Sequence, residues 1–142
     1  MAEVSIKNFT RRPCASHAVF TAIVAHVLPR WDISLVFVGS TRARAMNKQL
    51  RGKTYVPNVL SYAAGKKNGE ICICLQEAER QAPMYDMDTR TFVLYLFIHG
   101  LLHLKGLAHG VTMERCEQKL VAKFASSKTR IPIHVTKNRN WH

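Results

Sequence analysis

Three histidines, His99, His103 and His109, are spaced so that their imidazole rings could meet on one metal ion. His99 and His103 are four residues apart, which places both side chains on one face of a helix, one turn above the other. Gly106 can adopt the positive φ that ends a helix, and the turn would bring His109 round to supply a third nitrogen. The spacing therefore predicts three protein ligands and an open fourth coordination position.

The open position indicates a catalytic metal. Structural zinc usually has four protein ligands, whereas catalytic zinc has three and a water. Three neutral imidazoles leave the charge of the ion intact, so it could lower the pKa of a bound water towards ~7 and polarise a carbonyl or phosphoryl oxygen. We expect one Zn²⁺ per chain, with another divalent transition metal as the alternative. A lone histidine on an apolar helix is more often a hydrogen-bonded core residue, but two matched spacings joined by a glycine favour the metal.

The charge of the chain points to a polyanionic partner. Its 142 residues include 21 Lys and Arg against nine Asp and Glu, which gives a net charge of +12. An anionic membrane surface could also attract this charge, but 47% hydrophobic residues patterned into separate elements indicate a folded domain. We expect one domain over residues 1–142 that binds nucleic acid, with a basic C-terminal extension at 126–142.

Neither a membrane span nor a disulfide framework is expected. The longest apolar run, 92–104, is shorter than the ~20 residues that a membrane helix needs, and two of the histidines interrupt it. The four cysteines show no Cys-x-x-Cys spacing, which suits a reduced, cytoplasmic protein. They stand at positions 14, 72, 74 and 116.

The periodicity of apolar residues predicts the elements that would position the histidines. Alternation predicts strands at 3–7, 33–38, 58–62 and 70–74, and the last two would form a hairpin around 65–69. Helical spacing predicts helices at 14–28, 41–50, 76–81 and 112–124, besides a long apolar helix that begins after Asp88 and carries the first two histidines. Gly39-Ser40 and Thr112 would cap two of these helices, and 83–87 would be a loop. Residues 131–135 suit a strand or a flexible basic tail equally.

The predicted helix at 41–50 has an organised basic face. Its apolar side would consist of Ala43, Met46 and Leu50. Arg44, Lys48 and Arg51 follow one another at spacings of four and three on another side. This face could bind nucleic acid, or it could be the solvated face of an ordinary surface helix.

The spacing of the histidines matches a zinc peptidase pattern, His-Glu-x-x-His-x-x-Gly-x-x-His, except at the glutamate. That glutamate acts as the general base in peptide hydrolysis, and Gly100 takes its place here. A zinc peptidase is therefore a weak alternative. A metal site on a strongly basic chain without this base is more consistent with phosphodiester cleavage, in which a metal and an arginine stabilise charge on phosphorus.

The segment from His99 to His109 reads His-Gly-x-Leu-His-Leu-x-Gly-x-x-His, which resembles the signature of the YbeY endoribonucleases, also called rRNA maturation factors. Residues 47–62 are similar to that family's Asn-x-x-x-Arg-x-Lys and Asp/Asn-Val-Leu-Ser-Phe segments, and 69–73 to its Gly-Asp-Ile-x-Ile strand. All three segments occur in the family's order. The resemblance covers about residues 3–125.

The resemblance implies a single α+β domain with zinc on the three histidines, and cleavage of single-stranded RNA that matures the 3′ end of small-subunit rRNA. It also implies that Arg51 is functionally important, as a guanidinium that clamps a phosphate. We expect the fold to be zincin-like, with about four strands in a mixed sheet and a buried metal-binding helix. The expected partners are rRNA and the ribosome or its assembly factors, and the residues expected to bind RNA are Arg44, Lys48, Arg51 and Lys53.

Two departures from the family pattern bear on activity. Ala108 stands where the family usually has an aspartate, so no carboxylate at this position can orient a ligand or accept a proton. Tyr62 and Ala63 replace the usual Phe-Pro. The leading hypothesis is a metal-dependent endoribonuclease of ribosome maturation. The alternative is a noncatalytic assembly factor that binds rRNA through its basic surface and holds its helices together with a structural metal.

Overall fold

Four strands form one mixed sheet in the order β1-β2-β4-β3. β2 pairs parallel with both β1 and β4, whereas β3 pairs antiparallel with β4 as the predicted hairpin and forms an edge of the sheet. The computed structural model describes residues 2–125, so the basic extension at 126–142 lies outside the described residues. The strands are β1 (Glu3–Asn8), β2 (Asp32–Val38), β3 (Val59–Gly65) and β4 (Asn68–Cys74).

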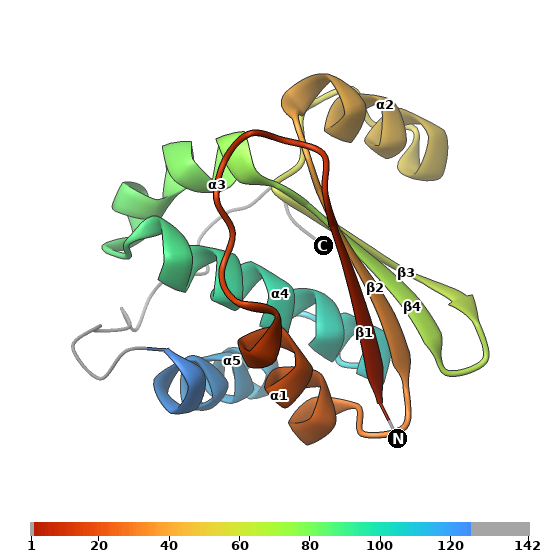
Figure 1. Cartoon of the computed structure of the whole chain (residues 1–142), viewed down its shortest axis with the longest axis vertical. Helices are drawn as coiled ribbons and strands as arrows, with labels where there is room; N and C mark the ends of the chain where they lie inside the picture. Colours follow the sequence, from red (N-terminus) through yellow and green to blue (C-terminus); the bar gives the residue numbers. More distant parts are fainter. Residues whose placement is uncertain (1, 126–142) are drawn as a thin grey trace.

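The helices lie on both faces of this sheet (Figure 1). Helices α1, α4 and α5 pack in one hydrophobic core with β1, β2 and β4, whereas α2 packs with the other face of the sheet in a smaller cluster. We call these the inner and the outer face. The helices are α1 (His17–Val27), α2 (Ser40–Arg51), α3 (Leu75–Gln81), η1 (Ala82–Tyr85), α4 (Thr89–Lys105) and α5 (Val111–Phe124). The predicted α+β class with a four-stranded mixed sheet is confirmed.

The alternation of the strands explains why each face has its own cluster. Leu35 and Ile71 point to the inner face and are fully buried in its core, while Val38 and Cys72 point to the outer face and belong to the cluster with α2. α4 is apolar on all sides, as is typical of a helix buried in the core. Each fully buried Leu or Phe side chain contributes roughly 1.5–3 kcal/mol to stability.

Two glycines let α4 approach β4 closely. A Cβ at Gly69 would lie 2.6 Å from Cδ1 of Leu104, and a Cβ at Gly100 would lie 3.2 Å from Cδ1 of Ile71. Side chains at these positions would push the helix and the sheet apart. The position of the histidines relative to the sheet therefore depends on this close packing.

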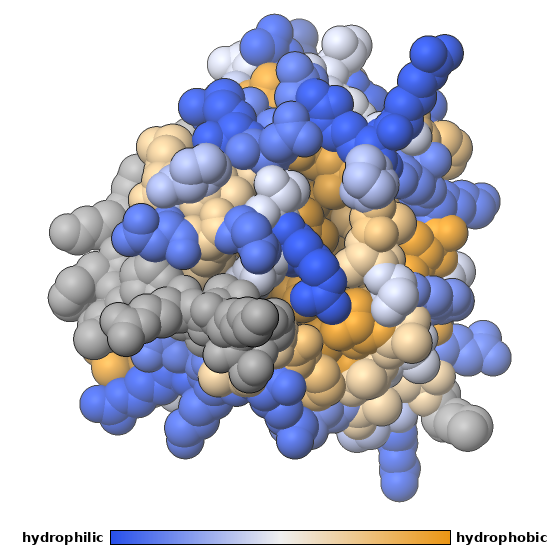
Figure 2. Space-filling model, turned by 60° about the vertical axis from the view of Figure 1, so that its left-hand side comes forward, coloured by the Kyte–Doolittle hydropathy of each residue, from blue (hydrophilic) through white to orange (hydrophobic). Residues whose placement is uncertain are grey.

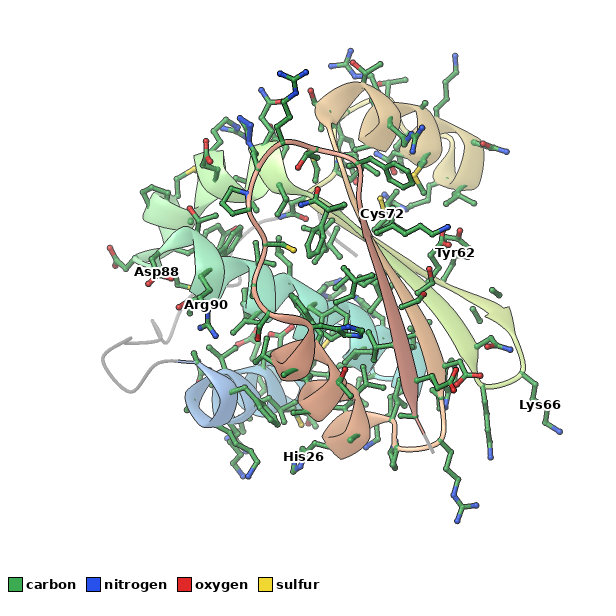
Figure 3. The ribbon with its side chains drawn as sticks, viewed as in Figure 1. His26, Tyr62, Lys66, Cys72, Asp88 and Arg90 are labelled. Carbon is green, nitrogen blue, oxygen red and sulfur yellow. The ribbon has the colours of Figure 1, made fainter. Side chains whose placement is uncertain are left out.

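Both predicted ends of α4 are confirmed. Oδ1 of Asp88, which Figure 3 labels beside the first turn, accepts the Thr91 N–H at 2.8 Å. At the other end, Gly106 is left-handed with φ of 110°, and its N–H donates to the His103 carbonyl oxygen at 3.0 Å. α4 is therefore capped in the manner expected from its sequence.

Several predicted boundaries are wrong. The first helix begins at His17 because Ser16 is extended at ψ 148°, so 14–16 are not helical. α5 begins at Val111 with Gly110 as its N-cap, so Thr112 lies inside the helix and does not cap it. Ser40 is likewise inside α2, and its hydroxyl donates to Gln76 of α3 at 3.1 Å. Part of the predicted loop at 83–87 forms the 3₁₀ helix η1.

Two expectations about the chain can be compared with residues 2–125. None of the helices there is both long and apolar enough to cross a bilayer. The four cysteines are all free. Cys72 and Cys74 are buried on the outer face, as expected for residues two apart in a strand, and Cys14 is exposed.

Candidate metal centre

The three histidines converge at the end of α4. His99 and His103 lie one turn apart on this helix, and His109 lies in the turn before α5. One nitrogen from each ring lies within 4.8 Å of the other two, and the ring centroids are 4.6–5.0 Å apart. His99 is buried, His103 is half-buried and His109 is exposed, so the site has a buried floor and an open side.

Hydrogen bonds orient the two rings on α4. Nδ1 of His103 lies 3.2 Å from the carbonyl oxygen of Leu107, which only accepts, so this nitrogen must carry the proton. Nδ1 of His99 contacts Oε2 of Glu117, and a carboxylate likewise only accepts. With Glu117 ionised, the lone pairs of both rings are therefore on Nε2.

The two Nε2 atoms face each other at 3.2 Å. Two lone pairs at this distance repel each other unless a proton or a cation lies between them. On a tetrahedral zinc with nitrogens at ~2.0–2.1 Å from the ion, two ligands lie ~3.3–3.4 Å apart. The donor set and its spacing therefore fit a zinc-like ion, with His109 as the third ligand from the exposed side.

Burial keeps both rings neutral. Desolvation, with a smaller effect from the nearby His109, lowers the pKa of His99 to about 3. Desolvation likewise lowers the pKa of His103 to about 4, with smaller effects from His99 and His109. A neutral imidazole is the form that binds a metal, so these two rings are ready to ligate at neutral pH without losing a proton from Nε2.

Glu117 is the polar residue of this site that the sequence analysis missed. Its side chain is only 2% exposed, and it lies on the apolar face of α5 with Met113 and Leu120. Tyr95 donates a hydrogen bond to its Oε1 at 3.3 Å. Burial raises the pKa of Glu117 to about 7. Its spacing of four from Met113 and three from Leu120 places it on the buried face of the helix. This spacing could have revealed Glu117 from the sequence, because a carboxylate on a buried face needs a partner.

Position 100, where a zinc peptidase has a glutamate, and position 108, where the family pattern has an aspartate, have different surroundings. Position 100 faces the side chain of Ile71 on β4, so a glutamate there would meet the sheet. Position 108 is exposed and carries only a methyl group. The buried carboxylate in contact with a ring of the triad is instead that of Glu117.

Arg51 lies at the end of α2, where its guanidinium is bonded within its own segment. It donates to Oδ1 of Asn47 at 3.1 Å and to the Tyr55 hydroxyl at 2.8 Å. Asn47 is fully buried and donates to the Tyr55 carbonyl oxygen at 3.0 Å. No hydrogen bond or ion pair found within residues 2–125 joins Arg51 to the triad.

The buried side of α2 differs from the predicted apolar side. Ala43 is buried and Met46 is half-buried, but Leu50 is 46% exposed. Asn47 takes the buried place because it fastens the segment that follows the helix. Residues 33–69 contain seven Lys and Arg and no Asp or Glu, so α2 and the hairpin turn form a uniformly basic stretch. Arg44, Lys48 and Lys53 are exposed there.

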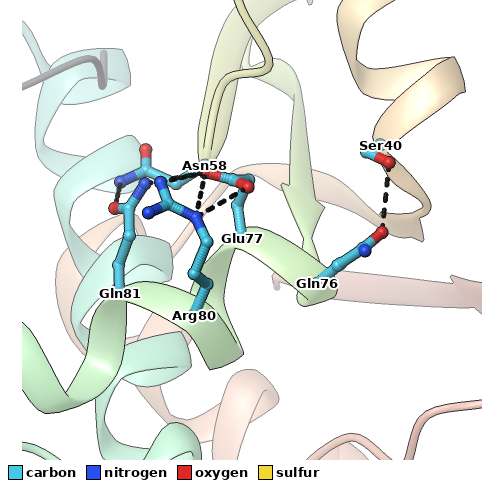
Figure 4. A network of polar contacts seen from close by, with 6 residues as sticks. All are labelled: Ser40, Asn58, Gln76, Glu77, Arg80 and Gln81. Atoms are coloured by element: carbon cyan, nitrogen blue, oxygen red, sulfur yellow. Dashed lines mark hydrogen bonds and ion pairs between the residues drawn. The ribbon is translucent and has the colours of Figure 1, made fainter.

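A polar network fastens the segment from Ser40 to Asn58 to α3 at both of its ends (Figure 4). Ser40 at the start of α2 donates to Gln76, and Nδ2 of Asn58 donates to Gln81 at 2.9 Å. Gln81 in turn donates to Glu77 at 3.0 Å. The chain between residues 40 and 58 is thus held at both ends.

The triad and the basic helix lie in different layers. α4 carries His99 and His103 on the inner face, with His109 just beyond its end, and α2 lies on the outer face with Cys72, which Figure 3 labels. The segment after Arg51 leads into β3, the edge strand that also packs against α4. β3 therefore links the two groups of residues, because it follows the segment after Arg51 and packs against α4.

A groove of about 460 Å³ lies elsewhere, between the loop before α1 and the starts of α3 and α4. Its lining includes Arg12, Cys14, Leu75, Arg90 and Val93, and none of the predicted site residues. Figure 2 brings this side of the molecule forward and shows apolar surface among hydrophilic side chains. The groove is separate from both the triad and α2.

Comparisons with known proteins agree with this architecture. A sequence model of a family described as endoribonuclease YbeY matches residues 3–125. The endoribonuclease YbeY of Mesoplasma florum is 34% identical over 100 residues, covering 63% of this chain and 59% of the relative. That of Heliobacterium modesticaldum is 28% identical over 135 residues, covering 83% and 78%. That of Allorhizobium ampelinum is 34% identical over 110 residues, covering 68% of this chain and 66% of the relative. The chain therefore spans about two thirds or less of the length of the Mesoplasma florum and Allorhizobium ampelinum proteins.

A solved structure shares the fold. The solution structure of a Thermotoga maritima protein superposes with a TM-score of 0.62 and covers 85% of this chain and 88% of its own. The two sequences are 19% identical, so this likeness concerns the fold alone.

Proposed function

Because the chain belongs to the YbeY endoribonuclease family, we propose that it is a metal-dependent endoribonuclease that cleaves single-stranded RNA and matures the 3′ end of small-subunit rRNA. The observation that carries the proposal is the pair of Nε2 atoms that face each other at 3.2 Å beside a third histidine. The proposed ligands are His99, His103 and His109, with Zn²⁺ as the ion and one ion per chain.

A metal ion bound here would polarise a phosphoryl oxygen of the substrate. The exposed ring of His109 leaves one side of the site open, which gives a phosphodiester access to it. Gly100 and Ala108 offer no carboxylate as a general base. The proposed nucleophile is water or the 2′-hydroxyl of the RNA. The charge that develops on phosphorus needs a second cation.

We assign that role to Arg51, with Arg44, Lys48 and Lys53 as contacts to flanking phosphates. Exposed basic side chains on a stretch without acidic residues suit a polyanion. Since α2 and the triad lie on opposite faces, a bound strand would cross the edge of β3. Arg51 would exchange its bonds to Asn47 and Tyr55 for a phosphate.

The second candidate function is that of a noncatalytic factor that binds rRNA and uses the metal to hold α4 and α5 together. Two observations favour it: Ala108 carries no carboxylate, and Arg51 is engaged within its own segment. A zinc peptidase has no such support, because Gly100 packs against the sheet. Both remaining functions take place on rRNA during ribosome assembly, and the free cysteines favour the cytoplasm.

The test uses a labelled single-stranded RNA and a duplex of the same sequence. We expect metal-loaded protein to cleave the single strand, and His103→Ala or Arg51→Ala to reduce cleavage at least ~10²–10³-fold, as is typical when one electrostatic contact to a transition state is lost. His26→Ala and Arg30→Ala are matched controls, because both side chains are exposed and lie outside the triad and α2.

The outcomes separate the two candidates. Cleavage that survives both substitutions contradicts the enzymatic proposal. Tight, salt-dependent RNA binding without cleavage by the metal-loaded protein favours the assembly factor. The predicted single domain over 1–142 stays a prediction for the basic extension at 126–142, and removal of the extension in the same assays tests its contribution to RNA affinity.

A further inference from the structure

We propose that Glu117 is a positioning residue of the metal centre: its buried carboxylate holds His99 in the tautomer whose Nε2 lone pair faces His103. This inference rests on the proposed metal site. It assigns the orienting carboxylate to α5, whereas the sequence shows only that position 108 lacks one.

The first argument is the burial of the pair. His99 and Glu117 are each only 2% exposed, so neither can replace its partner by water. An isolated carboxylate on the apolar face of α5 would be strongly unfavourable. Glu117 is retained there with two partners, the His99 ring and the Tyr95 hydroxyl.

The second argument is the geometry of α4. Tyr95, His99 and His103 follow one another at spacings of four, so they form one stripe along the helix. Glu117 spans the first two of them from α5. The tyrosine fixes one carboxylate oxygen, and the other oxygen fixes the ring.

The third argument is the contrast with His103. A backbone carbonyl, that of Leu107, orients the His103 ring and is present whatever the side chain. The ring of His99 depends on a side chain from another helix, so its orientation can be removed by a single substitution. Residues that orient metal-binding histidines typically change metal affinity 10–100-fold when they are replaced.

The decisive experiment measures Zn²⁺ affinity of the full chain by competition with a chelator, and the visible absorption spectrum of the Co²⁺-loaded protein. We expect Glu117→Gln to weaken Zn²⁺ binding roughly 10–100-fold and to change the Co²⁺ spectrum. Tyr95→Phe should have a smaller effect in the same direction. Glu114→Gln, on the same helix and one turn earlier, is the matched control and should bind like the unmodified chain.

A third readout does not depend on metal. ¹⁵N NMR of the metal-free protein reports which nitrogen of His99 carries the proton, and Glu117→Gln should alter that distribution while leaving His103 unchanged. If Glu117→Gln lowers stability but leaves Zn²⁺ affinity and the Co²⁺ spectrum unchanged, Glu117 is merely structural and the inference is wrong.

The proposed function can fail separately. If the unmodified chain binds Zn²⁺ but cleaves no RNA, the enzymatic proposal fails while the role of Glu117 stands or falls on the affinities. If the unmodified chain takes up neither Zn²⁺ nor Co²⁺, both are overturned. Circular dichroism of each variant identifies a loss of fold, in which case Tyr95→Phe, which keeps its ring in the core, decides the question.

Discussion

The end of α4 with its histidines and the helix α2 with its basic residues lie on opposite faces of one sheet and are built differently. His99 and Glu117 are buried, and each depends on contacts from a second element. Arg44 and Lys48 are exposed, and they form a basic surface through their positive charge and their spacing along one helix. A site that must hold ring nitrogens at fixed distances requires close packing, whereas a surface that attracts phosphates requires only an excess of positive charge.

The two regions meet at the segment between Arg51 and β3. Buried asparagines hold this segment: Asn47 bonds Tyr55, and Asn58 bonds Gln81. The basic helix is thereby fastened to the segment that leads into β3, and this segment is fastened to α3. Substitutions in the two regions should therefore affect different properties, and the following experiments test that division.

The largest expected effect concerns an added carboxylate. Gly100→Glu should lower the free energy of unfolding by at least ~3 kcal/mol, because the side chain would meet Ile71 and bury a charge. Ala45→Glu, at an exposed position of α2, should change it by less than ~0.5 kcal/mol. Urea unfolding of both variants measures the difference. Equal stabilities would show that α4 does not pack closely at Gly100.

The second effect is that of metal on stability. Zn²⁺ at 100 times its dissociation constant should stabilise the protein by ~2.7 kcal/mol, since it binds the folded state. Thermal unfolding with and without a chelator measures the shift. His103→Ala should abolish it, and Arg51→Ala should leave it intact. A shift that survives His103→Ala would place the ion outside the triad.

The third effect is on RNA affinity. Arg44→Gln with Lys48→Gln should weaken binding and lower the slope of log affinity against log salt by ~1.4, because each lost contact to single-stranded RNA contributes ~0.7. Stability and Zn²⁺ affinity should not change.

The matched control for this charge removal is Arg115→Gln with Lys119→Gln. These two residues are also exposed and four apart, but they lie on α5. If both double variants weaken binding equally, RNA recognition is not specific to α2.

The smallest expected effect is on the stability of the metal-free protein below neutral pH. The folded pKa values of His99 and His103, about 3 and about 4, lie below the ordinary 6.5. The unfolded chain therefore binds more protons below pH 6.5, so the contribution of these residues is present above pH 6.5 and is lost as pH falls towards 4. Metal-free His103→Gln should lose less stability than the unmodified chain between pH 6.5 and 5.

Thermal unfolding in a pH series measures this difference. The raised pKa of Glu117 gives stability the opposite dependence on pH, and the comparison with the unmodified chain cancels it because both proteins contain Glu117. His26→Gln, an exposed histidine on α1, should follow the unmodified chain. Parallel pH profiles for all three proteins would mean that His103 titrates normally in the folded state.

The local features of the candidate site were predictable because they depend on neighbours in the chain. A spacing of four on a helix, the cap at Asp88 and the left-handed Gly106 are properties of a few consecutive residues. The hairpin of β3 and β4 was predictable for the same reason. Leu50, which was expected on the apolar side of α2, is exposed, whereas the polar Asn47 is buried because it bonds a later segment.

The sequence alone therefore determined the three candidate ligands, the excess of positive charge and the elements of the fold, since periodicity and composition are local quantities. Only the tertiary structure decided that Glu117 reaches His99, that Gly100 faces Ile71 and that α2 lies across the sheet from the triad. Each of these depends on which faces of distant elements pack together. That choice is made by the free energy of the whole core, in which apolar burial outweighs the preferences of any single segment.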